Sequence, residues 1–379
     1  MKILHTSDWH LGMSEKGADL KEDQLFFINQ IREIVRDHQV DAVIIAGDVF
    51  DRAFVSSEAI RMYDDAVTGL CREEVVSTIV IAGNHDGAER LSQCSRLLGN
   101  SGLHIAGTAA RTAEKVEFDD TDIYLLPWVD TARAKYEFPE KEEDITDTEA
   151  AYRVICDSIR EHMDTSKNNI LVSHAFIIDA ETSESDRSAE IGFASAVSSS
   201  IFDGFDYVAL GHLHKPQDIT DTIRYCGTPM PYSFGREETQ EKSVTIIDTE
   251  DMSRTIVPLK LLHQRTTLKG TFDEIIQGEV PEEVLNGYVR IELTDRFIGP
   301  QTVMALRQVY PNILECTGLS YDEGGAKTTI TADELKQKSS DPISVFHSFC
   351  ADVIGIEPDQ KQLALFQEAA EESEKEELQ

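Results

Sequence analysis

The sequence predicts an α/β fold for its first two thirds, because short apolar runs alternate with amphipathic helical stretches. The apolar runs are rich in valine, isoleucine and alanine, and they occur at residues 3–4, 42–46, 78–82, 170–172 and 207–210. Runs of this composition are typical of buried strands. Each run ends in a polar cluster, and in parallel α/β sheets ligands bind beyond the carboxyl ends of the strands.

Helical periodicity predicts three helices between these strands, the first over residues 23–35 and the second beginning after Ser56, its expected N-cap. Their apolar stripes are Phe27, Ile31 and Ile34; Ile60, Tyr63, Val67 and Leu70; and Tyr152, Ile155, Ile159 and Met163. Each stripe gives its helix one face with which to cover a sheet.

Other segments of this region are predicted from composition. The acidic stretch 132–150 is expected to be a surface loop, and the polar stretch 179–190 a mobile loop beside the site. Residues 223–228 and 244–247 are expected to be further strands.

The composition changes after Pro258, and we expect a small α+β domain with an alternating strand at Val289, Ile291 and Leu293. A helix is expected at 303–309 and a turn at 322–327. Two amphipathic helices are expected after residue 341, followed by a glutamate-rich tail. The expected domains are 1–262, 263–340 and 341–379.

Composition restricts the function. The chain of 379 residues has a net charge of −35, which repels polyanions unless bound cations or a partner reverse the sign locally. Its 6 cysteines form no C-x-x-C pair, and there is no signal-peptide pattern and no apolar run long enough to span a bilayer, so we expect a cytoplasmic protein with reduced thiols. There is no Walker-type motif, so any ATP must be bound by another subunit.

The polar clusters at the strand ends contain only the residue types that bind hard or borderline divalent metals. The candidates are Asp8, His10, Asp48, Asn84, His174, His212 and His214. Carboxylate and imidazole ligands suit manganese, iron or zinc, and a carboxylate such as Asp48 can bridge two ions. A two-ion centre activates water and neutralises a phosphate under attack. Any one of these residues alone is more often a helix cap or a surface histidine, so it is their joint order that predicts the centre.

The same clusters carry a resemblance to a known family, the calcineurin-like metallophosphoesterases, and within it to the double-strand-break repair nucleases. The motifs are Asp8-Trp9-His10, Gly47-Asp48-Val49-Phe50-Asp51, Gly83-Asn84-His85-Asp86, Ser173-His174, and Gly211-His212-Leu213-His214. The resemblance is strong over about residues 1–250 and weaker beyond. One departure is Ser233-Phe234-Gly235-Arg236, where the family more often has a Ser-Phe-Ser-Glu-like run.

The resemblance implies a four-layer α/β/β/α sandwich with a small α+β cap domain and C-terminal helices. It implies one ion held by Asp8, His10, Asp48 and His214, and a second held by Asp48, Asn84, His174 and His212. It further implies His85 as the catalytic acid, Asp86 as the residue that orients His85, Asp51 outside the ligand set, and manganese as the usual ion, with magnesium as a substitute.

The implied function is a DNA nuclease subunit, 3′-to-5′ exonuclease on duplex ends and endonuclease on single strands and hairpins, acting in repair, recombination and replication. The implied partners are an SMC-family ATPase docked on residues 341–370 and a second copy of the chain, joined through residues 56–70 and 89–98 in a heterotetramer. The alternatives are a stand-alone phosphoesterase for a small phosphodiester or phosphoprotein, and a non-catalytic scaffold subunit.

Overall fold

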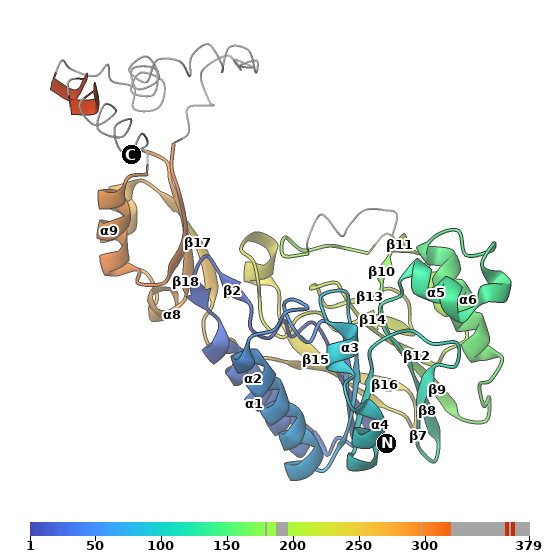
Figure 1. The fold of residues 1–379 in the computed structure, drawn as a ribbon. Helices are drawn as coiled ribbons and strands as arrows, with labels where there is room; N and C mark the ends of the chain where they lie inside the picture. Colours follow the sequence, from blue (N-terminus) through green and yellow to red (C-terminus); the bar gives the residue numbers. More distant parts are fainter. Residues whose placement is uncertain (179, 187–195, 297, 320–360, 364, 368–379) are drawn as a thin grey trace. The chain divides into compact units, whose positions relative to one another are not determined.

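Two six-stranded mixed sheets lie face to face in the larger of the two units into which the chain divides (Figure 1). That unit comprises Met1–Glu292 and Gly299–Cys316, and the other comprises Leu293–Ile298 and Thr317–Gln379. The computed structural model describes residues 1–178, 180–186, 196–296, 298–319, 361–363 and 365–367.

The first sheet contains the N-terminal strand and has the order β16-β15-β1-β4-β5-β6. In that order its strands are Ser253–Pro258, Ser243–Asp248, Lys2–Thr6, Ala42–Ala46, Ser77–Ile81 and Leu103–Ala106. Strands β1, β4, β5 and β6 are parallel, whereas β15 and β16 form an antiparallel extension. The carboxyl ends of β1, β4 and β5 therefore meet at one edge.

The second sheet has the order β13-β14-β12-β9-β8-β7. Its strands are Gln217–Asp218, Ile223–Tyr225, Tyr207–Gly211, Asn168–His174, Thr121–Leu126 and Glu114–Glu117. The four central strands are parallel and the two outer ones antiparallel. In the β12–β9 pair, Gly211 lies opposite His174, so two of the predicted polar clusters meet.

The layers follow from alternation along the strands. In β4, Val43 and Ile45 pack with α1 (Lys21–His38) and α2 (Ser57–Thr68), whereas Ile44 packs in the core between the sheets. Helices α5 (Thr131–Glu137) and α6 (Thr148–Arg160) cover the outer face of the second sheet. The predicted four-layer α/β/β/α sandwich is confirmed.

The predicted helices are present, but two details of the prediction were wrong. Ser56 caps α2 by accepting a hydrogen bond from the amide of Ala59, as expected. Ile60 is not part of the buried stripe and is 50% exposed, because Ala59, Met62, Ala66 and Val67 form the inner face instead. The acidic stretch 132–150 is not all loop, since its first residues belong to α5, whose N-cap is Asp130.

A three-stranded sheet follows the sandwich in sequence, with β17 (Arg265–Gly270), β18 (Tyr288–Leu293) and β19 (Ile313–Thr317) in that order. Helices α7 (Phe272–Gln277), α8 (Glu282–Asn286) and α9 (Pro300–Val309) accompany it. The expected alternation is confirmed, because Val289 and Ile291 are buried and Arg290 between them is not. The turn at 322–327 and most of the C-terminal helical region lie outside the described residues.

No helix among the residues described is long and apolar enough to cross a membrane. The cysteines at 71, 94, 156, 226 and 316 are free thiols.

Candidate metal centre

The strand ends bend sharply where the predicted ligands occur. Asp8, His10, Asp48 and His212 all have positive φ, at 53°, 43°, 48° and 109°. Such left-handed backbone is costly for residues with a Cβ and is concentrated at functional sites. Here the bends turn successive side chains out of the sheet plane and towards one another.

Two glycines allow close approach at this edge, Gly211 between the two sheets and Gly83 between neighbouring strand ends of the first sheet. A Cβ on Gly211 would lie 1.9 Å from the carbonyl oxygen of Ala46, and one on Gly83 would lie 2.1 Å from Oδ1 of Asp48. Neither position can hold a side chain without displacing the backbone or a predicted ligand. The expected close backbone approach beside the ligands is therefore present.

The structure brings all of the predicted ligands together. Donor atoms of Asp8, His10 and His214 lie within 4.8 Å of one another, as do those of Asp8, Asp48 and His174. Asn84 Oδ1 is 3.0 Å from His174 Nε2 and 3.0 Å from His212 Nδ1. The groups share Asp8, while Asp48 Oδ2 lies 3.4 Å from His174 Nε2 and 4.0 Å from His10 Nε2.

The donor set fits divalent cations. The Nε2 atoms of His10 and His214 face each other at 3.1 Å, and His10 Nδ1 is a buried nitrogen with no hydrogen-bond partner. Burial lowers the pKa of His10 and of His212 to about 3, so both rings are neutral and keep a lone pair for a metal. Carboxylates beside neutral imidazoles at this spacing are a site for hard or borderline ions.

The Asp48–His174 pair shows where positive charge is stabilised. Although burial opposes ionisation of Asp48, the imidazoles of His174, His85 and His10 hold the pKa of that carboxyl well below its usual range. Burial likewise disfavours a charged His174, but Asp48 outweighs it and raises the pKa of His174 to about 9. A bound cation would take the place of the proton on His174 that Asp48 stabilises.

His85 lies beside this group and is held by a backbone contact. Its Nδ1 donates to the carbonyl oxygen of Asp51 at 2.8 Å, and its Nε2 lies 3.9 Å from Asp48 Oδ2. Its donor atoms also group with those of His10 and Asp51 within 4.8 Å. The ring therefore presents Nε2 to the ligand cluster.

The Asp86 side chain, which we expect to orient His85, makes its described contacts with backbone amides. The Asp86 carboxylate accepts hydrogen bonds from the amides of Val49, Phe50 and Gly83 at 2.9–3.2 Å. Both of its oxygens are thus used to join the turn that follows Asp48 to the turn that precedes Asn84. Asp51, expected outside the ligand set, orients His85 through its carbonyl.

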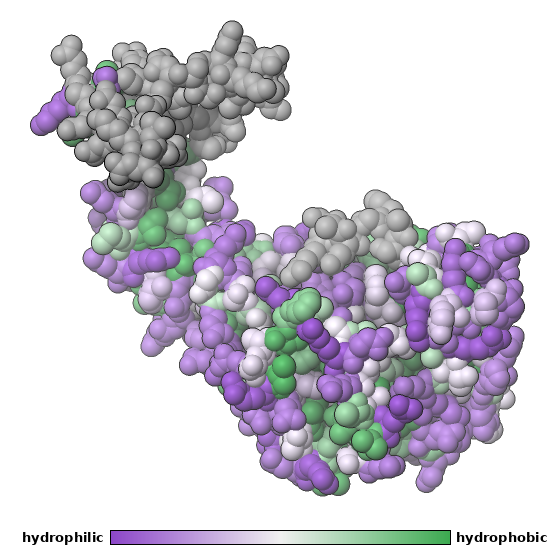
Figure 2. Space-filling model, viewed as in Figure 1, coloured by the Kyte–Doolittle hydropathy of each residue, from purple (hydrophilic) through white to green (hydrophobic). Residues whose placement is uncertain are grey.

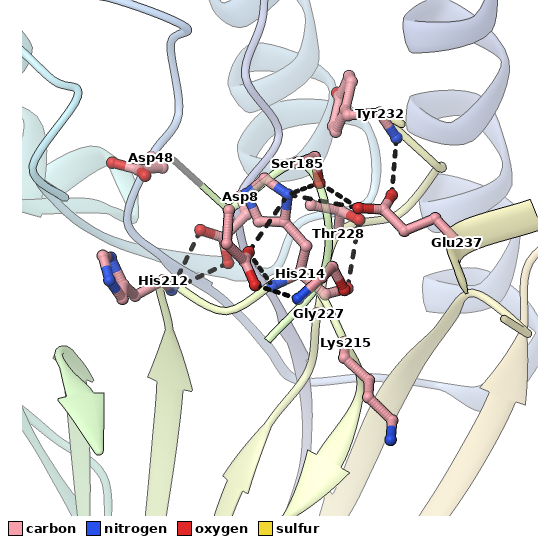
Figure 3. A network of polar contacts seen from close by, with 12 residues as sticks. Asp8, Asp48, Ser185, His212, His214, Lys215, Gly227, Thr228, Tyr232 and Glu237 are labelled. Carbon is pink, nitrogen blue, oxygen red and sulfur yellow. Dashed lines mark hydrogen bonds and ion pairs between the residues drawn. The ribbon is translucent and has the colours of Figure 1, made fainter. Parts of the chain in front are cut away.

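A buried polar network around His214 was not predicted (Figure 3). Ser185 Oγ lies 2.5 Å from His214 Nδ1 and also contacts Glu237, whose other oxygen is 3.4 Å from the Lys242 ammonium. Asp186 Oδ1 accepts from the His214 amide at 3.1 Å. These contacts fix the ring so that Nε2 faces His10.

Glu237 follows directly after the departure from the family pattern at 233–236. It lies in the short 3-10 helix Gly235–Thr239, is 1% exposed, and also accepts from the Tyr232 amide at 2.8 Å. Nothing in the sequence distinguishes Glu237 or Lys242 from the surrounding surface charges, because their burial depends on long-range packing. The residues 180–186 that carry Ser185 do lie beside the site, as expected.

Three aromatic side chains that contact predicted ligands were not predicted from the sequence either. The Trp128 ring stacks on His212, with ring centroids 5.4 Å apart and an interplanar angle of 29°, and Tyr232 packs edge-on to His10 at 5.5 Å. The Tyr152 hydroxyl donates to the carbonyl oxygen of His174 at 2.6 Å. These rings restrict the orientation of three predicted ligands.

Comparisons with known proteins identify the family of the chain. The model of the calcineurin-like phosphoesterase family matches residues 1–216. A curated relative from Staphylococcus epidermidis, named as the D subunit of the nuclease SbcCD, is 34% identical over 326 residues, which cover 85% of this chain and 86% of the relative.

Two solved structures are more distant. The protein TT1561 of Thermus thermophilus has 11% identity and a TM-score of 0.40, covering 68% of this chain and 99% of its own. The protein PH1004 of Pyrococcus horikoshii has 10% identity and a TM-score of 0.32, covering 69% of this chain and 88% of its own.

Replacing Glu237 with alanine should destabilise the metal-free protein by about 3–5 kcal/mol, because it leaves the buried Lys242 ammonium without its carboxylate. Urea unfolding measures this, with exposed Glu241→Ala as the matched control, for which we expect a change within about 0.5 kcal/mol. Equal stability of the two variants would show that the pair is unimportant.

Proposed function

Because the chain belongs to the calcineurin-like phosphoesterase family and, within it, to the SbcD nucleases, we propose that it is the Mn²⁺-dependent nuclease subunit of an ATP-dependent complex that cuts DNA. The proposed activities are 3′-to-5′ exonuclease on duplex ends and endonuclease on single strands and hairpins. The proposed setting is DNA repair, recombination and replication in the cytoplasm. The observation that carries the proposal is the cluster of buried Asp and His side chains, with half-buried Asn84 and His85 at its edge.

We assign one ion to Asp8, His10, Asp48 and His214, and the other to Asp48, Asn84, His174 and His212. Bound in this way, the cations would supply an activated water and neutralise the charge of the phosphate. Manganese is the proposed ion, because mixed imidazole and carboxylate donors suit it.

His85 is the proposed general acid. The Asp51 carbonyl fixes Nδ1 as a donor, so the imidazolium form carries its transferable proton on Nε2, which faces the cluster. From there it can protonate the sugar oxygen that leaves the phosphorus. Its carbonyl partner keeps the ring in place while the proton is transferred.

The donor set argues against a non-catalytic scaffold, because such a protein does not require buried ligands on strained backbone. The three-stranded sheet after residue 262 favours a macromolecular substrate over a small one, and we propose that residues 263–340 form the capping, DNA-binding domain beside the nuclease domain 1–262. The net charge of −35 means that DNA affinity must come from local cations and from the partner.

We also propose a homodimer through α2 and the segment that contains α3 (Ala88–Leu91) and α4 (Ser95–Leu98). An open groove of about 820 Å³ lies between them, and its apolar lining includes Ile60, Tyr63, Val67, Leu98 and Leu103. Figure 2 shows apolar surface in this region. A second copy would cover the side chain of Ile60, whose exposure the sequence did not predict.

Ile60→Asp should convert the dimer to a monomer in sedimentation equilibrium, because it places an unpaired charge in the covered groove. Ile256→Asp is the matched control, since Ile256 is 47% exposed on the outer strand β16, and it should leave the dimer intact. A dimeric Ile60→Asp protein would place the interface elsewhere.

The proposed ATPase partner is an SbcC-like SMC-family protein docked on residues 341–370, of which 361–363 and 365–367 are described and helical. Two observations support a separate ATPase: the chain has no Walker-type motif, and its sequence places an apolar stripe at 346–354.

His85→Gln should lower DNA cleavage by at least about 100-fold while Mn²⁺ loading stays near two ions per chain, because His85 is assigned to the leaving group. Elemental analysis measures metal loading, and cleavage of labelled hairpin DNA measures activity, so the two expectations are tested separately. Asp48→Ala is the contrasting variant, since loss of a shared ligand should remove both ions. Loss of metal from His85→Gln would overturn the assignment.

Deleting residues 341–379 should leave Mn²⁺-dependent hydrolysis of bis-p-nitrophenyl phosphate intact, whereas ATP-stimulated cutting of duplex ends should disappear. The point variant Phe346→Asp should give the same result, with thermal melting of the isolated chain as the control for misfolding. Full recovery of the truncated chain with the ATPase in a pull-down would show that the docking site lies elsewhere.

A further inference from the structure

A second cavity lies directly beside the metal centre and is not used by the chemistry described above. It has a volume of about 400 Å³, within the range of small-ligand pockets, and is lined by residues of the 11–14 and 51–56 loops and by Arg90. We propose that it binds one unpaired nucleotide of the substrate strand, with the base on Phe54 and the adjacent phosphate on Arg52. This inference rests on the proposed nuclease function.

The position of the cavity places its occupant next to the reacting phosphate. One wall is Leu11, the residue after the predicted ligand His10. Another is Asp51, whose carbonyl holds His85 Nδ1 at 2.8 Å and whose donor atoms group with His10 and His85 within 4.8 Å. A nucleotide that reaches from the cluster into this cavity is therefore a direct neighbour of the one being cut.

Phe54 supplies the surface for a base. Its side chain is 78% exposed, which is unusual for so large an apolar group, and it lines this cavity but not the larger groove that we assign to the dimer. The Arg90 guanidinium lies 4.4 Å from the ring centroid and donates to the Ala53 carbonyl at 3.2 Å. The ring is thus held in place in solvent, as in aromatic platforms that stack nucleic-acid bases.

Arg52 supplies the positive charge. Its side chain is 64% exposed and donates through Nε and Nη2 to Asp51 Oδ2, at 3.0 and 2.8 Å. A guanidinium has five N–H donors, so those not engaged by Asp51 can reach a phosphate oxygen. In a chain with a net charge of −35, arginines at 52 and 90 on the rim of one cavity make a local exception that favours an anion.

The stacking geometry selects an unpaired base. Inside a duplex both faces of a base are covered by its neighbours, so only a nucleotide in a single strand, a hairpin loop or a frayed end can lie on an aromatic ring. The cavity would therefore favour substrates that carry an unpaired base beside the cut, and it would have no effect on a small phosphodiester that lacks a base.

The test compares hydrolysis of a dT oligonucleotide, an abasic oligonucleotide of equal length and bis-p-nitrophenyl phosphate by the full chain with Mn²⁺. We expect wild type to cut dT with about tenfold higher kcat/KM than the abasic strand, and Phe54→Ala to lose that preference. Arg52→Gln should lower kcat/KM for both strands. It should also reduce the slope of log(kcat/KM) against log salt concentration by about one, as expected for the loss of one phosphate contact. Both variants should hydrolyse the small diester within about twofold of wild type, because that diester has neither a base for Phe54 nor a second phosphate for Arg52.

Matched controls come from α5, where Arg133 lies 5.3 Å from the ring of Tyr136, itself 75% exposed. Tyr136→Ala should behave as wild type on every substrate. The proposal is overturned if the Phe54→Ala variant keeps the preference for the dT strand over the abasic strand, or if it cuts dT as fast as wild type does. Wild type that hydrolyses the small diester but cuts neither strand, even with the ATPase partner present, would instead refute the nuclease function itself.

Discussion

The site depends on one hydrogen bond between the two sheets, from Nδ1 of His174 on β9 to the carbonyl oxygen of Ala46 on β4, at 2.9 Å. Because a carbonyl only accepts, the bond fixes the proton on Nδ1 and leaves Nε2 facing Asp48 and Asn84. It can form only because Gly211, paired with His174 in the second sheet, lets the backbone of Ala46 approach. The packing of the sandwich and the protonation of a predicted ligand are therefore set by the same contact.

The strands and the candidate ligands could be predicted from the sequence because both depend on local patterns of residues. Continuous apolar runs mark the buried strands, and parallel pairing brings Asp8, Asp48 and Asn84 to one edge of the first sheet and His174 and His212 to one edge of the second. Features that depend on side-chain packing between distant segments could not be predicted in this way. Ile60 was assigned to the wrong face of α2 because the buried side is decided by small residues such as Ala59 and Ala66, which carry little periodic signal.

The contacts that support the ligands were the least predictable part of the site. Asp86 follows His85 in sequence, yet it binds backbone amides, while the orienting carbonyl comes from Asp51, more than thirty residues earlier. Glu237 and Lys242 resemble surface charges in a chain rich in them, but they form a buried pair that reaches His214 through Ser185. Buried charges must be paired, so their positions are fixed by the fold as a whole.

The start of α1 shows how the metal centre is joined to the small sheet. Gln24 donates to the His10 carbonyl at 2.8 Å and accepts from the Gly12 amide at 3.1 Å, so it holds the turn that carries a predicted ligand. Asp23, the preceding residue, accepts from the amide of His263 and the hydroxyl of Tyr288, at 3.2 and 2.8 Å. Because adjacent residues of one helix hold both parts, the turn at His10 cannot shift without straining the contacts of the small sheet. The strained backbone at His10 is thereby held by hydrogen bonds from the helical layer of the sandwich, as such conformations require.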